Sequence, residues 1–346
     1  RLNLGLTLSN KDLHNYSISY SHPVGADGTV LGLAVSRMDY ELSGAFRRLG
    51  AEGTADTLSI FGTTPLWRTS KSSLAVSYGW DWRRLKDEYK AVGMELEKHS
   101  STFRLGLKGE ERQYRTSWTY DITAYCGRIG ADSDWARAQM KRAGTEGSFT
   151  KGVLNLNLRH EISDRWNISL KAQAQKAGTN LDSSEELYLG GANGVRAYPQ
   201  GEASGDNGYL TNLELSYRTD VPNLVLSTYF DMGRVQYAND GKDGSETLKG
   251  WGIGVTYSRP GDYFVRLDWA RRIGLPDVES ECHCLLLCET FSGPGADRPR
   301  QRRGRGNLPF PLRHGGQGPH RGPGLRRRLT VFSKRAPGWP AKRPGD

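Results

Sequence analysis

The sequence predicts an all-β protein, an antiparallel β-barrel that spans a membrane, and three observations lead to this prediction. Apolar residues occupy every second position in about thirteen separate runs between residues 1 and 274, and this is the periodicity of β-strands. Short turns and longer polar connections alternate along the chain, as they do in outer-membrane barrels. Aromatic residues such as Trp80, Trp82, Tyr257 and Trp269 lie near the ends of runs, where barrels carry aromatic girdles.

The thirteen runs divide into nine before a long central connection and four after it. Most approach the ~10 residues with which a tilted strand crosses a bilayer. We find no segment of helical period in the body of the chain, and no run of about 18 apolar residues that could span a membrane as a helix. The runs centre on residues 2–8, 16–20, 31–35, 58–61, 74–82, 103–107, 118–122, 154–158, 168–174, 213–217, 224–230, 251–257 and 263–269.

The connections between the runs differ in length in a regular way. Short turns are predicted at 24–28, 162–164, 219–222 and 260–262, and longer polar loops near 40–54, 86–99, 128–149, 178–207 and 238–246. We expect the short turns at one end of the barrel and the long loops at the other. A soluble sandwich or soluble barrel is the alternative, but so many similar strands with a single apolar face are hard to bury in one.

The positive charge of the chain is confined to its last part. The chain holds 48 Lys and Arg and 38 Asp and Glu; 14 and 4 of these lie in 281–346, so residues 1–280 carry 34 of each sign. Three of the four cysteines also lie in 281–346, and the earlier part holds only Cys126. The body is therefore neutral and is not a disulfide scaffold.

Alternation stops near residue 275, and the segment 275–346 has a different composition. Nine of the fifteen prolines lie in residues 281–346, together with arginine-rich runs. It is either a disordered basic arm for nucleic acid or anionic lipid or the product of out-of-frame translation, and we favour the second hypothesis. The spacing of Cys282, Cys284 and Cys288 fits no standard zinc pattern, so we predict no metal site and no cofactor.

One loop and two of the strands after it carry the only paired constellation of charged residues. Arg196 lies in a glycine-rich stretch of the longest connection, and Asp231 and Glu214 lie on the polar face of their strands, which would face the lumen. If the loop folds into the barrel, the Arg196 guanidinium can pair with Asp231 in a bidentate arrangement. A solvated loop arginine and a separate, hydrated aspartate are the alternative.

This constellation resembles two motifs of one transporter family. Gly190, Gly191, Val195, Arg196 and Tyr198 look like the Val-Arg-Gly-Tyr/Phe motif of the outer-membrane transporters of two-partner secretion. This is the haemolysin-activator and filamentous-haemagglutinin family (ShlB, FhaC, HecB), which belongs to the same superfamily as the assembly factor BamA. The resemblance extends over roughly residues 1–274.

The second motif of that family, aromatic-x-Asp-x-Gly, is similar to the stretch that holds Phe230, Asp231 and Gly233. The resemblance implies a 16-strand barrel in which the motif loop follows strand 11, enters the lumen and bonds the motif aspartate through its arginine. The motif glycine is Ala197 here. Because alanine disfavours positive φ, we expect a shifted loop tip.

The resemblance also implies that the chain is an incomplete barrel region. The family has periplasmic POTRA domains and a plug helix before its barrel. Here Arg1 already lies in an alternating run, with no initiator Met or signal peptide. We expect the domains, the first two strands and the last strand to be missing. An open sheet edge in lipid leaves unpaired backbone groups, each costing several kcal/mol, so we expect that this chain neither inserts nor secretes by itself.

The predicted function is passage through the bacterial outer membrane, not catalysis. The resemblance implies a monomeric, lipid-embedded channel that secretes or activates a large exoprotein of the haemolysin, haemagglutinin or adhesin type, threaded in unfolded form. We find no catalytic triad, no phosphate loop and no helix after the glycines that a dinucleotide site would need, and we expect no nucleic-acid partner. A BamA-like assembly factor, a passive porin and a soluble all-β binding protein are the alternatives.

Overall fold

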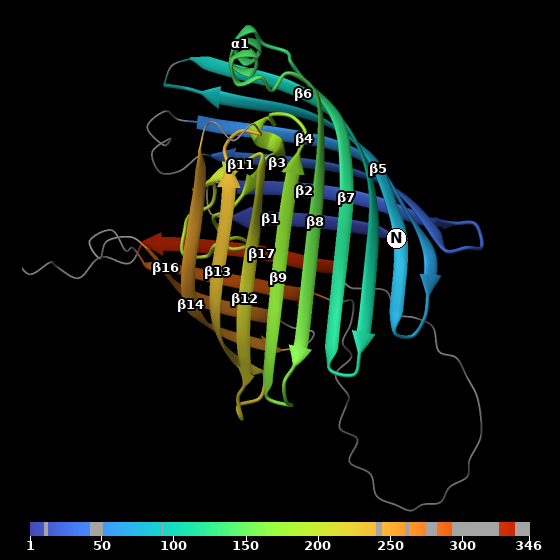
Figure 1. Cartoon of the computed structure of the whole chain (residues 1–346), viewed down its shortest axis with the longest axis vertical. Coiled ribbons are helices and arrows are strands. Elements are labelled where there is room, and N and C mark those ends of the chain that lie inside the picture. The colour runs from blue at the N-terminus through green and yellow to red at the C-terminus, as the bar shows by residue number, and fades with distance from the viewer. Residues whose placement is uncertain are drawn as a thin grey trace, which may run out of the picture.

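The computed structural model describes residues 1–9, 13–41, 51–91, 93–239, 244–259, 263–274, 282–292 and 325–335. One sheet dominates it and closes into a barrel (Figure 1). The thirteen predicted strands are present, nine before the central connection and four after it. They are β1 (Leu2–Ser9), β2 (Leu13–Val24), β3 (Thr29–Glu41), β4 (Ala51–Arg68), β5 (Ser72–Tyr89), β6 (Met94–Gln113), β7 (Thr116–Ala131), β8 (Gly147–Glu161), β9 (Trp166–Ala177), β12 (Asn207–Arg218), β13 (Leu224–Gln236), β14 (Ser245–Arg259) and β15 (Tyr263–Arg272).

The two faces of the sheet have opposite chemistry. Apolar side chains point outward and are exposed, as for Ile18 (57%) and Leu33 (53%), whereas polar residues such as Ser100 and Thr102 point inward and are buried. A soluble protein would bury the first kind and expose the second. The arrangement is that of a barrel whose outer face lies in lipid and whose lumen is polar.

Strands β4 to β7 are longer than the sequence predicted, at 18, 18, 20 and 16 residues. The predicted loop at 86–99 is therefore wrong, because β5 and β6 remain paired as far as Tyr89 and Met94. The extension is rich in charged residues, which we interpreted as a loop. Backbone pairing continues there because ladder hydrogen bonds do not depend on apolar side chains.

The prediction that the body holds no helix is also wrong. Helix α1 (Asp134–Ala143) lies between β7 and β8, with Ser133 as its N-cap and Gly144 in the left-handed region at its C-terminal end. Two of its side chains are buried, those of Ala136 and Met140, and so short an apolar face gives no clear period in the sequence. Among the residues that the structure describes, no helix has the length and apolar character to cross a membrane.

The structure also closes the sheet, which the sequence did not predict. Two further strands, β16 (Cys282–Ser292) and β17 (Leu325–Arg335), lie in the segment where we predicted none. β17 pairs with β1 in parallel. Antiparallel pairing through an odd number of strands leaves the first and last pointing the same way, so the closing pair has to be parallel. The expectation of an open edge is therefore wrong, because β1 and β15 both have partners; the reading frame of the segment stays a hypothesis.

The connection between β9 and β12 folds inward instead of extending away from the barrel. We call residues 178–206 the lumenal loop; it contains the 3-10 turn η2 (Ser183–Glu185) and the paired strands β10 (Leu187–Tyr188) and β11 (Ser204–Gly205). It lies at the same end of the barrel as α1 (Figure 1). Its apolar residues form a buried cluster with side chains of β12 to β15, so the loop packs as a small core inside the lumen.

Candidate functional site

The lumenal loop makes a compact turn that presents Arg196 to the barrel wall. Gly191 adopts φ of 100°, a conformation that favours glycine. The backbone N–H of Val195 donates to the carbonyl of Leu189 at 2.6 Å, and Gly190 forms a bridge with Val195. Val195 and Tyr198 are buried. The motif therefore folds on itself, with its two apolar residues in the core and its arginine directed at β13.

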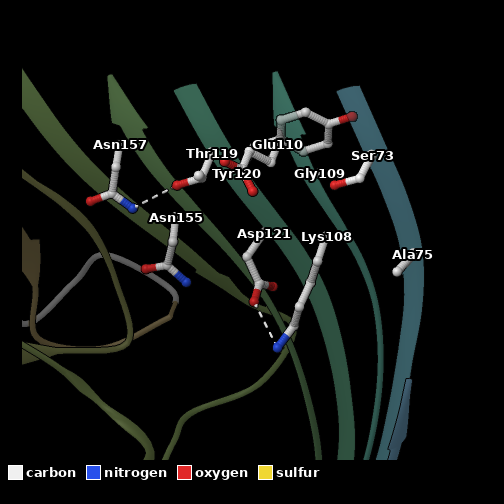
Figure 2. Close-up of a pocket in the computed structure, with 10 residues that line it drawn as sticks. All are labelled: Ser73, Ala75, Lys108, Gly109, Glu110, Thr119, Tyr120, Asp121, Asn155 and Asn157. Carbon is white, nitrogen blue, oxygen red and sulfur yellow. Dashed lines mark hydrogen bonds and ion pairs between the residues drawn. The ribbon is translucent and has the colours of Figure 1, made fainter. Parts of the chain in front are cut away.

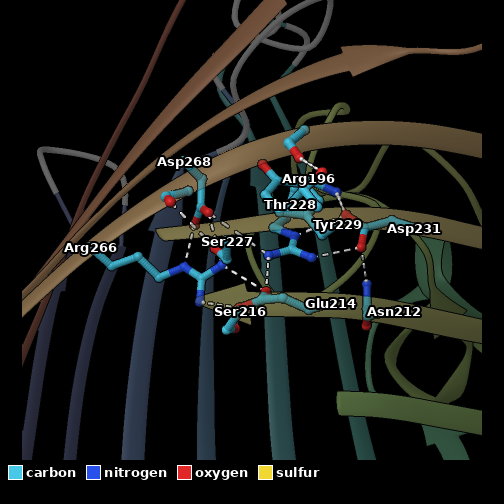
Figure 3. Close-up of polar contacts among 12 residues, drawn as sticks. Arg196, Asn212, Glu214, Ser216, Ser227, Thr228, Tyr229, Asp231, Arg266 and Asp268 are labelled. Carbon is cyan, nitrogen blue, oxygen red and sulfur yellow. Dashed lines mark hydrogen bonds and ion pairs between the residues drawn. The ribbon is translucent and has the colours of Figure 1, made fainter. Parts of the chain in front are cut away.

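The structure brings Arg196 and Asp231 into direct contact (Figure 3). Arg196 Nε donates to Asp231 Oδ2 at 2.9 Å, Nη2 donates to Oδ1 at 2.8 Å, and the Arg196 backbone N–H donates to Oδ2 at 3.0 Å. This is the bidentate geometry in which a guanidinium binds a carboxylate most strongly. The two side chains are only 8% and 1% exposed, so the alternative of a solvated, independent pair does not fit the structure.

Glu214 and Asn212 complete the surroundings of the pair from β12. Arg196 Nη1 donates to Glu214 Oε2 at 3.0 Å, and Asn212 Nδ2 donates to Asp231 Oδ1 at 2.9 Å. Asn212 also donates to the carbonyl of Gly194 at 2.8 Å. A buried ion pair is tolerated when its remaining donors and acceptors are satisfied, and here both members have further partners.

A second arginine, from β15, extends the network. Arg266 donates to both oxygens of Glu214, at 3.1 and 2.8 Å, and to Asp268 Oδ2 at 2.7 Å. Figure 3 shows the two guanidinium groups on either side of Glu214. We call Arg196, Glu214, Asp231, Arg266 and Asp268 the charged centre. It contains three carboxylates and two guanidinium groups, so the wall supplies more negative than positive charge to the loop.

Strand β14 lies between β13 and β15 and leaves space for this network. Three successive inward positions of β14 are Gly250, Gly252 and Gly254. A Cβ atom on Gly252 would lie 2.5 Å from the Tyr229 ring. That ring stacks on the Arg196 guanidinium, with the central carbon 3.3 Å from the ring centroid, a favourable cation–π arrangement. Because these three positions carry no side chain, the loop approaches the wall closely there.

Ala197 occupies the place of the motif glycine. The residues of positive φ in the described structure do not include it, so its backbone is not in the left-handed region that alanine disfavours. Its carbonyl accepts a hydrogen bond from Arg272 Nε at 3.2 Å. Its methyl group faces Gly250, where an added Cβ would come within 2.6 Å. Alanine is accommodated because β14 carries glycine opposite it.

The two remaining motif residues lie outside the charged centre. Phe230 points outward and is 41% exposed, so it belongs to the lipid-facing surface. Gly233 lies beside the side chain of Leu189 at the base of the motif turn. Our sequence prediction left out Tyr229, Arg266 and the other wall residues that contact the loop. These residues lie on the polar face of alternating strands, and that position is the sequence signal by which they could have been identified.

Burial changes the acid–base behaviour of the loop itself. Burial raises the pKa of the Glu186 carboxyl, while the hydroxyl of Ser204, which donates to it at 2.5 Å, acts in the opposite direction. Burial also raises the pKa of the Tyr188 hydroxyl to about 12. Where side chains are described, no group of three or more His, Cys, Asp or Glu could hold a metal ion.

Three comparisons with known proteins agree with this geometry. Residues 1–257 match the family described as haemolysin secretion/activation protein ShlB/FhaC/HecB. The chain is 27% identical over 306 residues to the Heme/hemopexin transporter protein HuxB of Haemophilus influenzae, which covers 84% of this chain and 54% of that protein. The chain therefore spans about half the length of the curated relatives it matches.

Two solved structures share the fold. CdiB from Escherichia coli has a TM-score of 0.63 at 22% identity, with 77% of this chain and 50% of that chain covered. BamA from Haemophilus ducreyi lacking POTRA domains 1–3 has a TM-score of 0.56 at 15% identity, with 81% and 62% covered. At these identities the likeness shows the fold alone. The match over residues 1–257 shows more: this chain belongs to the family described as haemolysin secretion/activation protein ShlB/FhaC/HecB, and its fold is that of an outer-membrane β-barrel.

Proposed function

We propose that the chain forms the translocation channel through which one large partner exoprotein, of the haemolysin, haemagglutinin or adhesin type, leaves the cell in unfolded form. The observation that supports this most directly is the buried Arg196–Asp231 pair inside a polar lumen. A passive porin has no need for a loop fastened by buried ion pairs. A transporter that has to hold and release a loop during passage does.

The charged centre has a positional role in this proposal. A buried ion pair adds little net stability relative to well-packed apolar residues, yet breaking it by removing one partner is costly. Such a pair therefore specifies one loop position sharply without stabilising the whole barrel. The closed sheet also removes the reason for expecting that the chain fails to insert into a membrane.

The experiment compares the proteins in the medium of the source bacterium with and without the gene. We expect one large protein to disappear from the medium on deletion and to return with the wild-type gene. Arg196→Ala should restore the barrel to the outer membrane but much less of the secreted protein. An unchanged medium would refute the proposal. A general loss of other outer-membrane barrels would favour an assembly factor instead.

A further inference from the structure

A second group of buried charges holds the lumenal loop, away from the charged centre. Asp182 accepts from Lys98 Nζ at 2.8 Å, and Glu185 accepts from Arg83 Nη2 at 2.6 Å and Lys151 Nζ at 2.8 Å. The exposed fractions of the Asp182, Glu185, Lys98 and Lys151 side chains are 5%, 2%, 6% and 9%. We call these five residues the stem clamp.

The local fold of the stem explains why both carboxylates point at the wall. Asp182 is the N-cap of turn η2, and its Oδ1 accepts from the N–H and the hydroxyl of Ser184. Its Oδ2 is thereby left for Lys98. The backbone carbonyl of Glu185 accepts from Lys151 Nζ at 2.7 Å and from Gln175 at 3.1 Å. A three-residue turn therefore places two carboxylates against one side of the barrel, with each oxygen of Asp182 occupied.

The stem clamp and the charged centre, the two fastenings of the loop, lie on different parts of the barrel wall. The clamp uses β5, β6 and β8, and the centre uses β12, β13 and β15. Only β9 lies between β8 and β12 in the fifteen-strand ring, so these two parts of the wall are near neighbours. The loop thus contacts the wall from β5, through Arg83, to β15, through Arg272.

The polarity of the two fastenings is reversed. At the stem clamp, the loop supplies the carboxylates and the wall supplies the cations. At the charged centre, the loop supplies the Arg196 cation and the wall supplies all three carboxylates. A loop that turned around, or slid along the wall from one fastening to the other, would bring like charges together at low dielectric. Charge complementarity therefore specifies one orientation.

We propose that Asp182 and Glu185 are positioning residues that hold the loop stem to β5, β6 and β8, so that the loop keeps its position along the wall only while both the stem clamp and the charged centre are intact. Loss of the stem clamp should release the loop without any change at Arg196. This inference rests on the proposed function only for its consequence in transport; the loop position itself can be measured on the purified barrel.

The test uses the full chain, reconstituted in lipid bilayers, with its four cysteines replaced by serine and one reporter thiol at Leu181→Cys. Leu181 is 3% exposed and adjoins the clamp. The double variant Asp182→Asn, Glu185→Gln keeps side-chain size and removes both charges. We expect it to raise the labelling rate of the reporter at least tenfold and to increase the single-channel conductance, with smaller effects in each single variant.

The matched control neutralises another inward-facing carboxylate that has no contact with the loop. Asp121 pairs with Lys108 at 3.3 Å beside a groove of about 350 Å³ on the inner wall, lined by polar residues of β5 to β8 (Figure 2). Asp121→Asn should leave labelling and conductance at the values of the parent. A similar increase in this control would show a general charge effect and would overturn the proposal.

A charge swap separates positioning from simple loss of stability. Asp182→Lys with Lys98→Asp reverses the 2.8 Å pair and should restore slow labelling relative to Asp182→Lys alone. Wild-type labelling and conductance in the double neutral variant, or no restoration by the swap, would overturn the inference. Heat-modifiable migration on gels identifies any variant whose barrel fails to fold. If the double neutral variant fails to fold, the labelling rates of the two single variants test the inference instead. If labelling changes while the deletion strain secretes normally, the clamp stands and the proposed function fails.

Discussion

Replacement of Arg196 by alanine should undock the lumenal loop while the barrel remains folded. In the variant, Asp231 loses both side-chain hydrogen bonds from the guanidinium and retains only the Arg196 backbone N–H and the amide of Asn212. Glu214 keeps its bidentate partner Arg266. The perturbation therefore leaves one buried carboxylate, Asp231, without a compensating cation.

The expected magnitude follows from the burial of that carboxylate. Its side chain is 1% exposed, so solvent screens it little, and breaking such a buried pair costs about 3–5 kcal/mol. At about 1.4 kcal/mol per factor of ten, the ratio of docked to undocked loop should fall between roughly 100-fold and several thousand-fold. Asp231→Asn should cost less, because Arg196 retains Glu214 at 3.0 Å.

The assay is the labelling rate of a buried reporter, Ala203→Cys, in the cysteine-free background. Ala203 is 4% exposed and belongs to the apolar cluster of the loop. Arg196→Ala should raise the rate until it approaches that of a free thiol. The matched control is Arg115→Ala, which removes an exposed pair with Asp164 and should change nothing, since exposed pairs contribute about 0–1 kcal/mol.

Two results would refute this reasoning. One is an unchanged labelling rate in Arg196→Ala, which would show that the pair does not hold the loop. The other is a loss of heat-modifiable barrel in parallel with undocking, which would show that the centre stabilises the sheet instead of positioning the loop.

Three further predictions concern other parts of the described structure. Gly252→Ala would place a Cβ atom 2.3 Å from the Trp269 carbonyl oxygen and 2.5 Å from the Tyr229 ring, so it should displace both and weaken loop docking in the same labelling assay. Gly152→Ala should not, because an added Cβ there meets nothing within 4 Å; equal rates in the two variants would contradict the account of β14. Because burial raises the pKa of Glu186, loop docking should weaken as the pH rises from the ordinary carboxyl pKa through the raised value. In Glu186→Gln, the labelling rate should no longer depend on pH across that range. If the pH dependence persists in this variant, it belongs to another group. Ser133→Ala removes the N-cap of α1 and should reduce the stability of that helix by about 1 kcal/mol. The connection that holds α1 should then be proteolysed faster, with no change in the heat-modifiable migration of the barrel. Unchanged proteolysis would mean that the cap is dispensable.

Side-chain alternation was enough to predict the strands and the faces on which their residues lie. Alternation is a local property, so the thirteen runs and the inward position of Glu214 and Asp231 could be predicted without any knowledge of neighbours. The same parity places Arg266 and Asp268 in the lumen. It says nothing of how far a polar hairpin continues, which is why β5 and β6 are longer than predicted.

The course of the lumenal loop and the closure of the sheet depend on contacts between residues far apart in the sequence. The partners of Asp182 and Glu185 lie 84 and 102 residues away in the sequence, and no local pattern connects them. Our pairing of Arg196 with Asp231 rested on resemblance, because the residues alone favoured a solvated arginine and a separate, hydrated aspartate. Closure of the ring by β17 depends on the free backbone groups of β1 and β15. Pairing of that kind is set by geometry across the whole barrel, whereas side-chain alternation is set within each strand.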